Sequence, residues 1–132
     1  MGAARGYNWI GYALASQGIV TVGLNHYGES WVYGQETIDM SAVLRFWERP
    51  RDVTFVLDQL SQNYIKSDAN RPTFNRDIDW TNVTAIGHSS GGATVAALAG
   101  SRLELRKAET YCASLASKED KSCGYMKHQL EA

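Results

Sequence analysis

The run Gly87-His88-Ser89-Ser90-Gly91-Gly92 contains the pattern Gly-x-Ser-x-Gly, in which a serine lies between two glycines. Chance would give roughly 0.09 matches in a chain of this composition, so the pattern alone is only suggestive. In enzymes that transfer acyl groups, such a serine attacks a carbonyl carbon and forms an acyl-enzyme, which water then hydrolyses. The pattern predicts this chemistry where it follows a buried strand and precedes a helix, and the residues on both sides favour that setting.

Each residue of the motif has a physical role in such a turn. Ser89 has to lie at a sharp strand-to-helix turn with a strained backbone, and Gly87 and Gly91 remove the side chains that would clash there. The N–H of Ser90, at the start of the helix, can donate to the developing oxyanion. The competing interpretation is that Ser89 only caps the helix, as serine often does. The glycines on both sides of Ser89 favour the nucleophile.

A serine nucleophile needs a base, and the chain has three histidines. His88 occupies the variable position of the motif, where a sharp turn should send its side chain away from the serine. His26 follows the first apolar run and is expected to support a loop. Asp120 and His128 are the one Asp–His pair that follows Ser89 in triad order, but they lie in a polar tail without a buried strand to position them. We therefore expect no histidine within about 2.6–3.2 Å of the serine Oγ.

Two short β-branched runs, residues 19–24 and residues 83–86, predict strands buried on both faces, as in parallel sheets. The apolar spacing of residues 9–16, followed by Gly18, predicts a helix, and residues 93–99 predict a small-residue helix. Four further residues share the helical spacing: Met40, Val43, Leu44 and Trp47.

Pro50 is expected to open the next helix, with Asp52 in its first turn. Residues 66–80 are polar and predict a surface loop. The order of helix, strand, helices, strand and helix predicts an α/β fold with a parallel sheet. Because two strands make a poor sheet, we expect the chain to be part of a domain. The helix after Pro50 carries one apolar stripe: Val53, Val56, Leu57, Leu60 and Tyr64.

The composition of the 132 residues excludes several classes of protein. Thirteen Lys and Arg balance fourteen Asp and Glu, which gives no electrostatic basis for binding nucleic acid. No apolar run reaches the roughly 18 residues of a membrane-spanning helix, and residues 1–6 lack the apolar stretch of a signal peptide. No Cys or His cluster predicts a metal site. Cys112 and Cys123 either form one bridge, which would indicate an oxidising compartment, or remain two unrelated thiols.

The chain resembles the α/β-hydrolase superfamily, most closely the predicted dienelactone hydrolases related to platelet-activating-factor acetylhydrolase. Residues 79–92, across the serine motif, are the most specific part of the resemblance. Cys112, after Tyr111, and Cys123 resemble a cysteine-bearing segment of exported bacterial members, which implies a periplasmic or secreted protein. Three further stretches carry the resemblance: residues 9–24, Asn25-His26-Tyr27-Gly28, and residues 46–60.

The resemblance implies an incomplete α/β-hydrolase domain with Ser89 as nucleophile, the Ser90 N–H in the oxyanion hole, and no cofactor. Residues 1–132 lack the earlier strand with its oxyanion loop and the later strands that bear the triad Asp and His. The implied activity is hydrolysis of a small-molecule ester or lactone, with little activity from this chain alone. The alternative is a non-catalytic fragment or pseudoenzyme that acts in packing or partner binding. Three aromatic residues either line a substrate pocket or belong to the core: Trp31, Tyr33 and Trp47.

Overall fold

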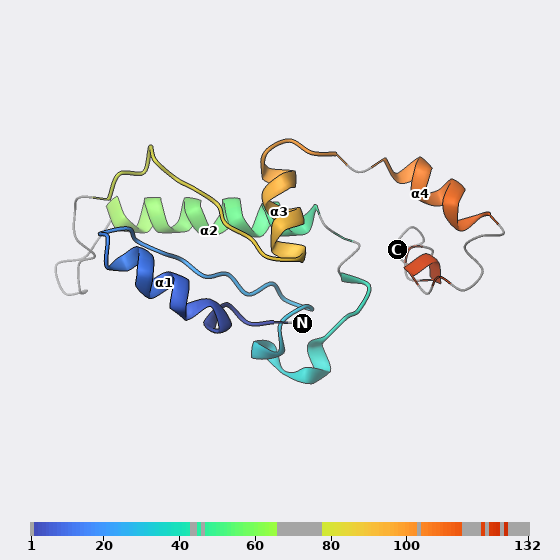
Figure 1. The fold of residues 1–132 in the computed structure, drawn as a ribbon, viewed down its shortest axis with the longest axis horizontal. Coiled ribbons are helices and arrows are strands. Elements are labelled where there is room, and N and C mark those ends of the chain that lie inside the picture. The colour runs from blue at the N-terminus through green and yellow to red at the C-terminus, as the bar shows by residue number, and fades with distance from the viewer. Residues whose placement is uncertain are drawn as a thin grey trace.

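The computed structural model of the chain describes residues 2–42, 45, 47–65, 78–102, 104–114, 120, 122–124 and 126. Helices dominate this part of the chain (Figure 1). Their order is η1 (Ala4–Tyr7), α1 (Asn8–Ala15), η2 (Trp31–Tyr33), η3 (Gln35–Thr37), α2 (Glu48–Ile65), α3 (Ser90–Leu98) and α4 (Leu105–Cys112), where η marks a 3₁₀-helix.

The predicted α/β fold is wrong for the described residues, which form helices and no β-strand. Residues 19–24 and 82–87 instead run as stretched, irregular chain beside the helices (Figure 1). A strand requires a neighbour that completes its ladder of backbone hydrogen bonds, and the described residues provide none for either segment. Their side chains are also not buried, since Val20 is 52% exposed and Ile86 is 65% exposed.

Helices α1, α2 and α3 (Ser90–Leu98) lie close to where the sequence predicts them. Helix α1 ends at Ala15, and Gly18 follows it with a φ of +76°, a left-handed conformation that favours glycine after a helix. Helix α2 begins at Glu48, which places Pro50 within the first turn, where backbone N–H groups have no partner inside the helix. The sequence predicted that Asp52 lies in the first turn of this helix. That prediction is wrong, because Asp52 lies one turn into α2.

The second predicted helical stretch, residues 40–47, is not an α-helix where the structure describes it. Residues 40–42, Arg45 and Trp47 lie in turns, a 3₁₀ turn or irregular chain, and Val43 and Leu44 lie outside the described residues. Residues 66–77 of the predicted surface loop also lie outside the described residues. Residues 78–80 lie in irregular chain and a turn, as expected.

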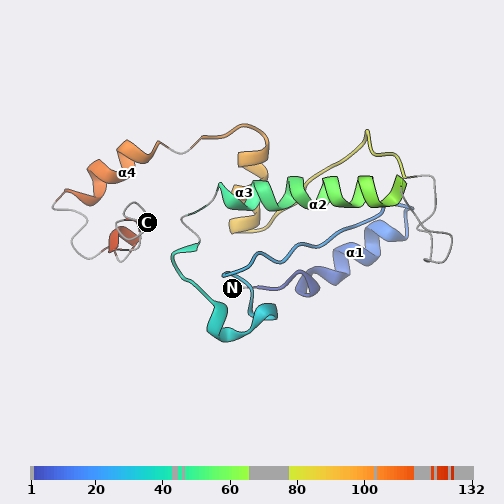
Figure 2. The ribbon, with the colours of Figure 1, turned by 180° about the vertical axis from the view of Figure 1, so that it is seen from behind.

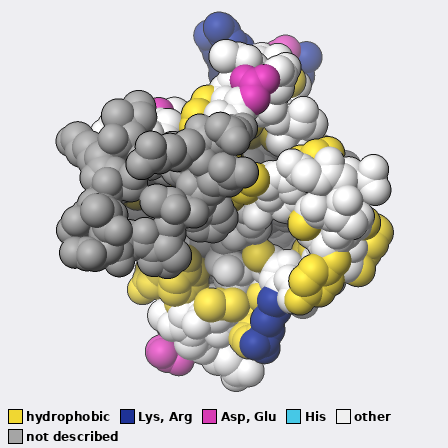
Figure 3. All heavy atoms as spheres, turned by 90° about the vertical axis from the view of Figure 1, so that its left-hand side faces the viewer, with side chains coloured by type: hydrophobic (Ala, Val, Ile, Leu, Met, Phe, Trp, Pro, Cys, Tyr) yellow, Lys and Arg dark blue, Asp and Glu magenta, His cyan; other side chains and the backbone are white. Residues whose placement is uncertain are grey.

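The small interior is formed by short side chains. Among the described residues, Ala3 and Ala42 are the buried hydrophobic side chains, and Ser30, Ser41 and Thr94 are buried polar ones. Helix α3 packs against α2, whereas α4 lies to one side of the other helices in both views (Figures 1 and 2). Hydrophobic side chains therefore remain on the surface, as the view of one end of the molecule shows (Figure 3).

The three singled-out aromatic side chains are all partly exposed, so the described structure does not bury them in a core. Trp31 lies 4.0 Å below the guanidinium carbon of Arg5, measured to its ring centroid, which is a cation–π contact. Tyr33 donates a hydrogen bond of 2.9 Å from its hydroxyl to the backbone oxygen of Asn25. These contacts tie η2 to η1 and to the chain after residues 19–24.

Candidate active site

Ser89 has the backbone that the nucleophile hypothesis predicts. Its φ is 54° and its ψ is −122°, and it is the one residue other than glycine with a positive φ in the described part of the chain. Such a conformation costs a serine about 1–3 kcal/mol and is concentrated at functional sites. Helix α3 begins at the next residue, Ser90, so the sharp turn into a helix is confirmed, although the segment before it is irregular chain and not a strand.

The two motif glycines differ in what they do. A Cβ added to Gly87 would overlap the backbone carbonyl of Gly91 and would lie 2.7 Å from the nitrogen of Gly92, so only glycine fits at position 87. A Cβ added to Gly91 would meet no atom within 4 Å beyond its own helix. The predicted steric role is therefore supported at Gly87 and wrong at Gly91, whose own backbone is what approaches Gly87.

Two polar groups of the turn, the Ser89 hydroxyl and the Ser90 N–H, make no hydrogen bond within the described part of the chain. Ser89 precedes α3 without a side-chain capping bond, so its hydroxyl does not serve as the helix cap that the competing interpretation requires. The backbone oxygen of Ser89 accepts hydrogen bonds from the N–H groups of Gly92 and Ala93, at 2.9 and 3.3 Å. The N–H of Ser90 has no hydrogen-bond partner among the described residues, as an oxyanion donor requires.

Two of the three histidines are occupied by other partners. Tyr7 Oη and His88 Nδ1 share a hydrogen bond of 2.9 Å, which directs the His88 side chain toward η1. His26 Nδ1 lies 2.6 Å from Asp52 Oδ2, so this histidine links the chain after residues 19–24 to α2. No hydrogen bond joins the Ser89 hydroxyl to either ring.

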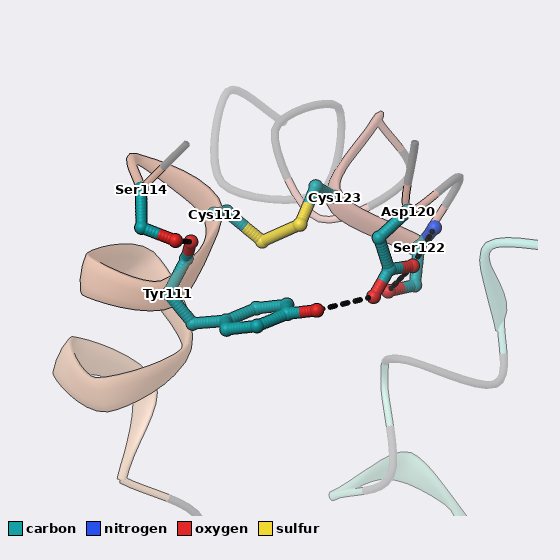
Figure 4. Close-up of a disulfide and its surroundings, with 6 residues drawn as sticks. All are labelled: Tyr111, Cys112, Ser114, Asp120, Ser122 and Cys123. Atoms are coloured by element: carbon teal, nitrogen blue, oxygen red, sulfur yellow. Dashed lines mark hydrogen bonds between the residues drawn. A yellow bond between two sulfur atoms is a disulfide. The ribbon is translucent and has the colours of Figure 1, made fainter. Parts of the chain in front are cut away.

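The predicted Asp–His pair of the C-terminal tail is described at one end only, since His128 lies outside the described residues. Asp120 accepts hydrogen bonds from the Ser122 hydroxyl and backbone N–H, at 2.6 and 2.9 Å, and from the hydroxyl of Tyr111 at 3.3 Å (Figure 4). The bonds from Ser122 are the main reason that the pKa of Asp120 lies below its usual value. These contacts give Asp120 a local role in the tail.

Cys112 and Cys123 form a disulfide, with Cα atoms 5.4 Å apart (Figure 4). This separation lies within the range of about 4.4–6.8 Å that such a bridge requires. The bridge joins the end of α4 to the chain that follows it, and the Tyr111–Asp120 bond spans the same two segments. The cysteines thus stabilise the C-terminal part and do not contact Ser89.

Sequence reasoning missed the ionic contacts that hold α2 and α3 in place. Arg49 donates to both carboxylate oxygens of Glu29, with 2.7 Å from its Nε to Glu29 Oε1, and its Nη1 lies 3.4 Å from the hydroxyl of Thr94. Arg49 and Glu29 are 20 residues apart, so no local spacing rule links them. The sequence carries no signal for this contact beyond the opposite charges of Glu29 and Arg49.

No family model matches the chain, and neither does any curated protein or solved structure. The described residues hold no group of three or more His, Cys, Asp or Glu side chains placed to bind a metal ion. Nor does the described part of the chain contain a helix both long enough and apolar enough to cross a membrane. The geometry around Ser89 therefore carries the functional argument.

Proposed function

We propose that Ser89 is the nucleophile of a serine hydrolase that acts on small-molecule carboxylic esters or lactones. The observation that carries this proposal is the left-handed backbone of Ser89 directly before the first residue of α3. A serine that only caps a helix has an extended backbone, and its hydroxyl accepts a bond from an N–H of the first turn. Ser89 has neither feature. The resemblance of residues 79–92 to dienelactone hydrolases supports the same class of reaction.

The reaction requires one new bond and one broken bond in each half. Ser89 Oγ forms a bond to the carbonyl carbon, and the carbonyl electron pair moves onto oxygen, where the Ser90 N–H donates to the resulting oxyanion. Collapse of this intermediate breaks the carbon–oxygen bond to the leaving group, whose oxygen takes up the proton that the Ser89 hydroxyl has lost. Water then attacks the acyl-enzyme and releases the acid and free Ser89.

The proton of the Ser89 hydroxyl determines how fast this chain can react. An unassisted serine is a weak nucleophile, and no described side chain accepts a hydrogen bond from this hydroxyl. We therefore expect weak hydrolysis of an activated ester by the 132-residue chain, with little loss of turnover in Ser89→Ala. Fast turnover that depends on Ser89 would show that the chain supplies a base, and His128→Ala would then identify it.

Covalent labelling tests the nucleophile without requiring turnover. Trypsin releases Ser89 in one peptide, residues 77–102, which also contains Ser90 and the exposed Ser101 as internal controls. After reaction with a fluorophosphonate, mass spectrometry should find at least about tenfold more label on Ser89 than on Ser101, equivalent to about 1.4 kcal/mol of activation free energy. Label spread evenly over the three serines would contradict the proposal.

A non-catalytic role in packing or partner binding is the second candidate function. The observation that favours it is the exposure of β-branched side chains along residues 19–22, where Ile19 and Val22 are each 50% exposed. Exposed apolar groups of this kind are typical of surfaces that bind another protein. Even labelling of the serines in the tryptic peptide would favour this second function over hydrolysis.

A further inference from the structure

A line of hydrogen bonds runs from Glu29 through Arg49 and Thr94 to the first residue of α3. The Glu29 carboxylate accepts two hydrogen bonds from the guanidinium of Arg49, which is the second residue of α2. Arg49 Nη1 donates to Thr94 Oγ1 at 3.4 Å. Thr94 Oγ1 in turn donates to the backbone oxygen of Ser90 at 3.0 Å. Each group in the line therefore has the donor or acceptor that its neighbour needs.

The three side chains of the line are largely shielded from water. The side chains of Arg49 and Glu29 are 12% and 13% exposed, and Thr94 is 5% exposed. Charged side chains are rarely covered to this degree unless they are paired, and a two-bond Arg–carboxylate contact fixes direction as well as distance. The other ion pairs in the described part of the chain have at least one partner more than 40% exposed.

The three residues come from three separate parts of the chain, the first two of which are also joined by the His26–Asp52 pair. Glu29 lies in the turn after residues 19–24, Arg49 in α2, and Thr94 one turn into α3. Thr94 is the buried residue of α3. The contact therefore joins α3 to α2 near the end of α3 that carries the strained turn.

We propose that Glu29, Arg49 and Thr94 are positioning residues, which hold the start of α3 so that the Ser89 hydroxyl and the Ser90 N–H face the same carbonyl group. This inference rests on the proposed function of Ser89. The three residues do not touch the reacting atoms. They act through Ser90, whose carbonyl accepts the bond from Thr94 and whose N–H is the oxyanion donor.

Thr94→Val tests the positioning role with little change of shape, because it replaces the hydroxyl by a methyl group. We expect the ratio of fluorophosphonate label on Ser89 to label on Ser101 to fall about fivefold, the size expected for one net hydrogen bond. Thr94→Ser keeps the hydroxyl and should restore the ratio. Thr110→Val is the matched control, because the Thr110 hydroxyl makes the same kind of bond, 2.8 Å to Arg106, on α4.

Hydrogen exchange gives a second reading that does not depend on chemistry at Ser89. In Thr94→Val, the N–H groups of Gly91, Gly92 and Ala93 should exchange about fivefold faster, while those of α1 remain unchanged. Arg49→Lys should act in the same direction, because a lysine cannot bond two carboxylate oxygens and the threonine together.

The outcomes separate the two proposals. If wild-type chain labels Ser89 selectively and Thr94→Val keeps that selectivity, the positioning role is wrong. An equal loss in Thr110→Val would also contradict it, because the effect would then belong to any helical threonine. If the wild-type chain shows no selectivity, the proposed function fails, and unchanged exchange in Thr94→Val would overturn the positioning role independently.

Discussion

Replacement of Gly87 by alanine should distort the turn that carries Ser89, whereas the same replacement at Gly91 should not. A Cβ at position 87 overlaps the Gly91 carbonyl and approaches the Gly92 nitrogen to 2.7 Å, and both atoms belong to backbone that cannot rotate away. Forcing atoms into filled space costs about 1–3 kcal/mol. We expect Gly87→Ala to lower the free energy of unfolding by about 2 kcal/mol, near the middle of that range.

Gly91→Ala is the matched control, because a Cβ there meets nothing within 4 Å beyond its own helix. Alanine is the better helix former by up to about 1 kcal/mol, so this variant should be neutral or more stable than wild type. Urea unfolding followed by circular dichroism measures both changes, and the fluorophosphonate assay should show that only Gly87→Ala loses selective labelling. Equal stability of the two variants would refute the steric reasoning.

Three further changes should have separable effects. Ser89→Gly should raise the free energy of unfolding by up to about 1 kcal/mol, because glycine adopts a positive φ without strain. Urea unfolding measures this change, and Ser89→Ala, which keeps the strain, is the control. Hydrogen bonds from the Ser41 hydroxyl and backbone N–H lower the pKa of Asp39. These bonds therefore stabilise the folded chain above the unfolded pKa of about 3.9, and the stabilisation is lost as the pH falls through the lower folded pKa. Ser41→Ala should therefore make stability fall less between neutral pH and acid, and an unchanged acid profile would contradict this cause. Reduction of the Cys112–Cys123 bridge should destabilise the C-terminal part by about 2–3 kcal/mol. Hydrogen exchange should become faster in α4 and remain unchanged in α1. Faster exchange in α1 as well would contradict this prediction, because it would show that the C-terminal part supports the rest of the chain.

The features that could be predicted from the sequence are those fixed by neighbouring residues. Apolar spacing located α1 and α2, and the Gly-x-Ser-x-Gly pattern located the start of α3 and the strained backbone of Ser89. Cys112 and Cys123 are also only 11 residues apart in the sequence, a short separation across which pairing is easy. In each case the interactions that determine the structure lie within a few turns of the chain.

The features that could not be predicted depend on distant partners. The β-branched residues 19–24 have the side chains of a strand, but strand formation needs a second strand, and the described residues provide none. The contact of Glu29 with Arg49 joins residues far apart in sequence. Helix α4 was missed although Leu105, Ala108 and Cys112 have helical spacing, because this stripe is only eight residues long and lies in a mainly polar segment.

We propose that the Ser89 hydroxyl is placed to attack a carbonyl carbon but lacks a base among the described residues. The most direct test is the rate at which Ser89 is phosphonylated with and without added imidazole. Imidazole can accept the proton that no described side chain accepts, so the rate at Ser89 should rise with imidazole concentration far more steeply than the rate at Ser101 in the same peptide. A rise of equal steepness at the two serines would contradict the claim that the turn before α3 makes Ser89 a nucleophile.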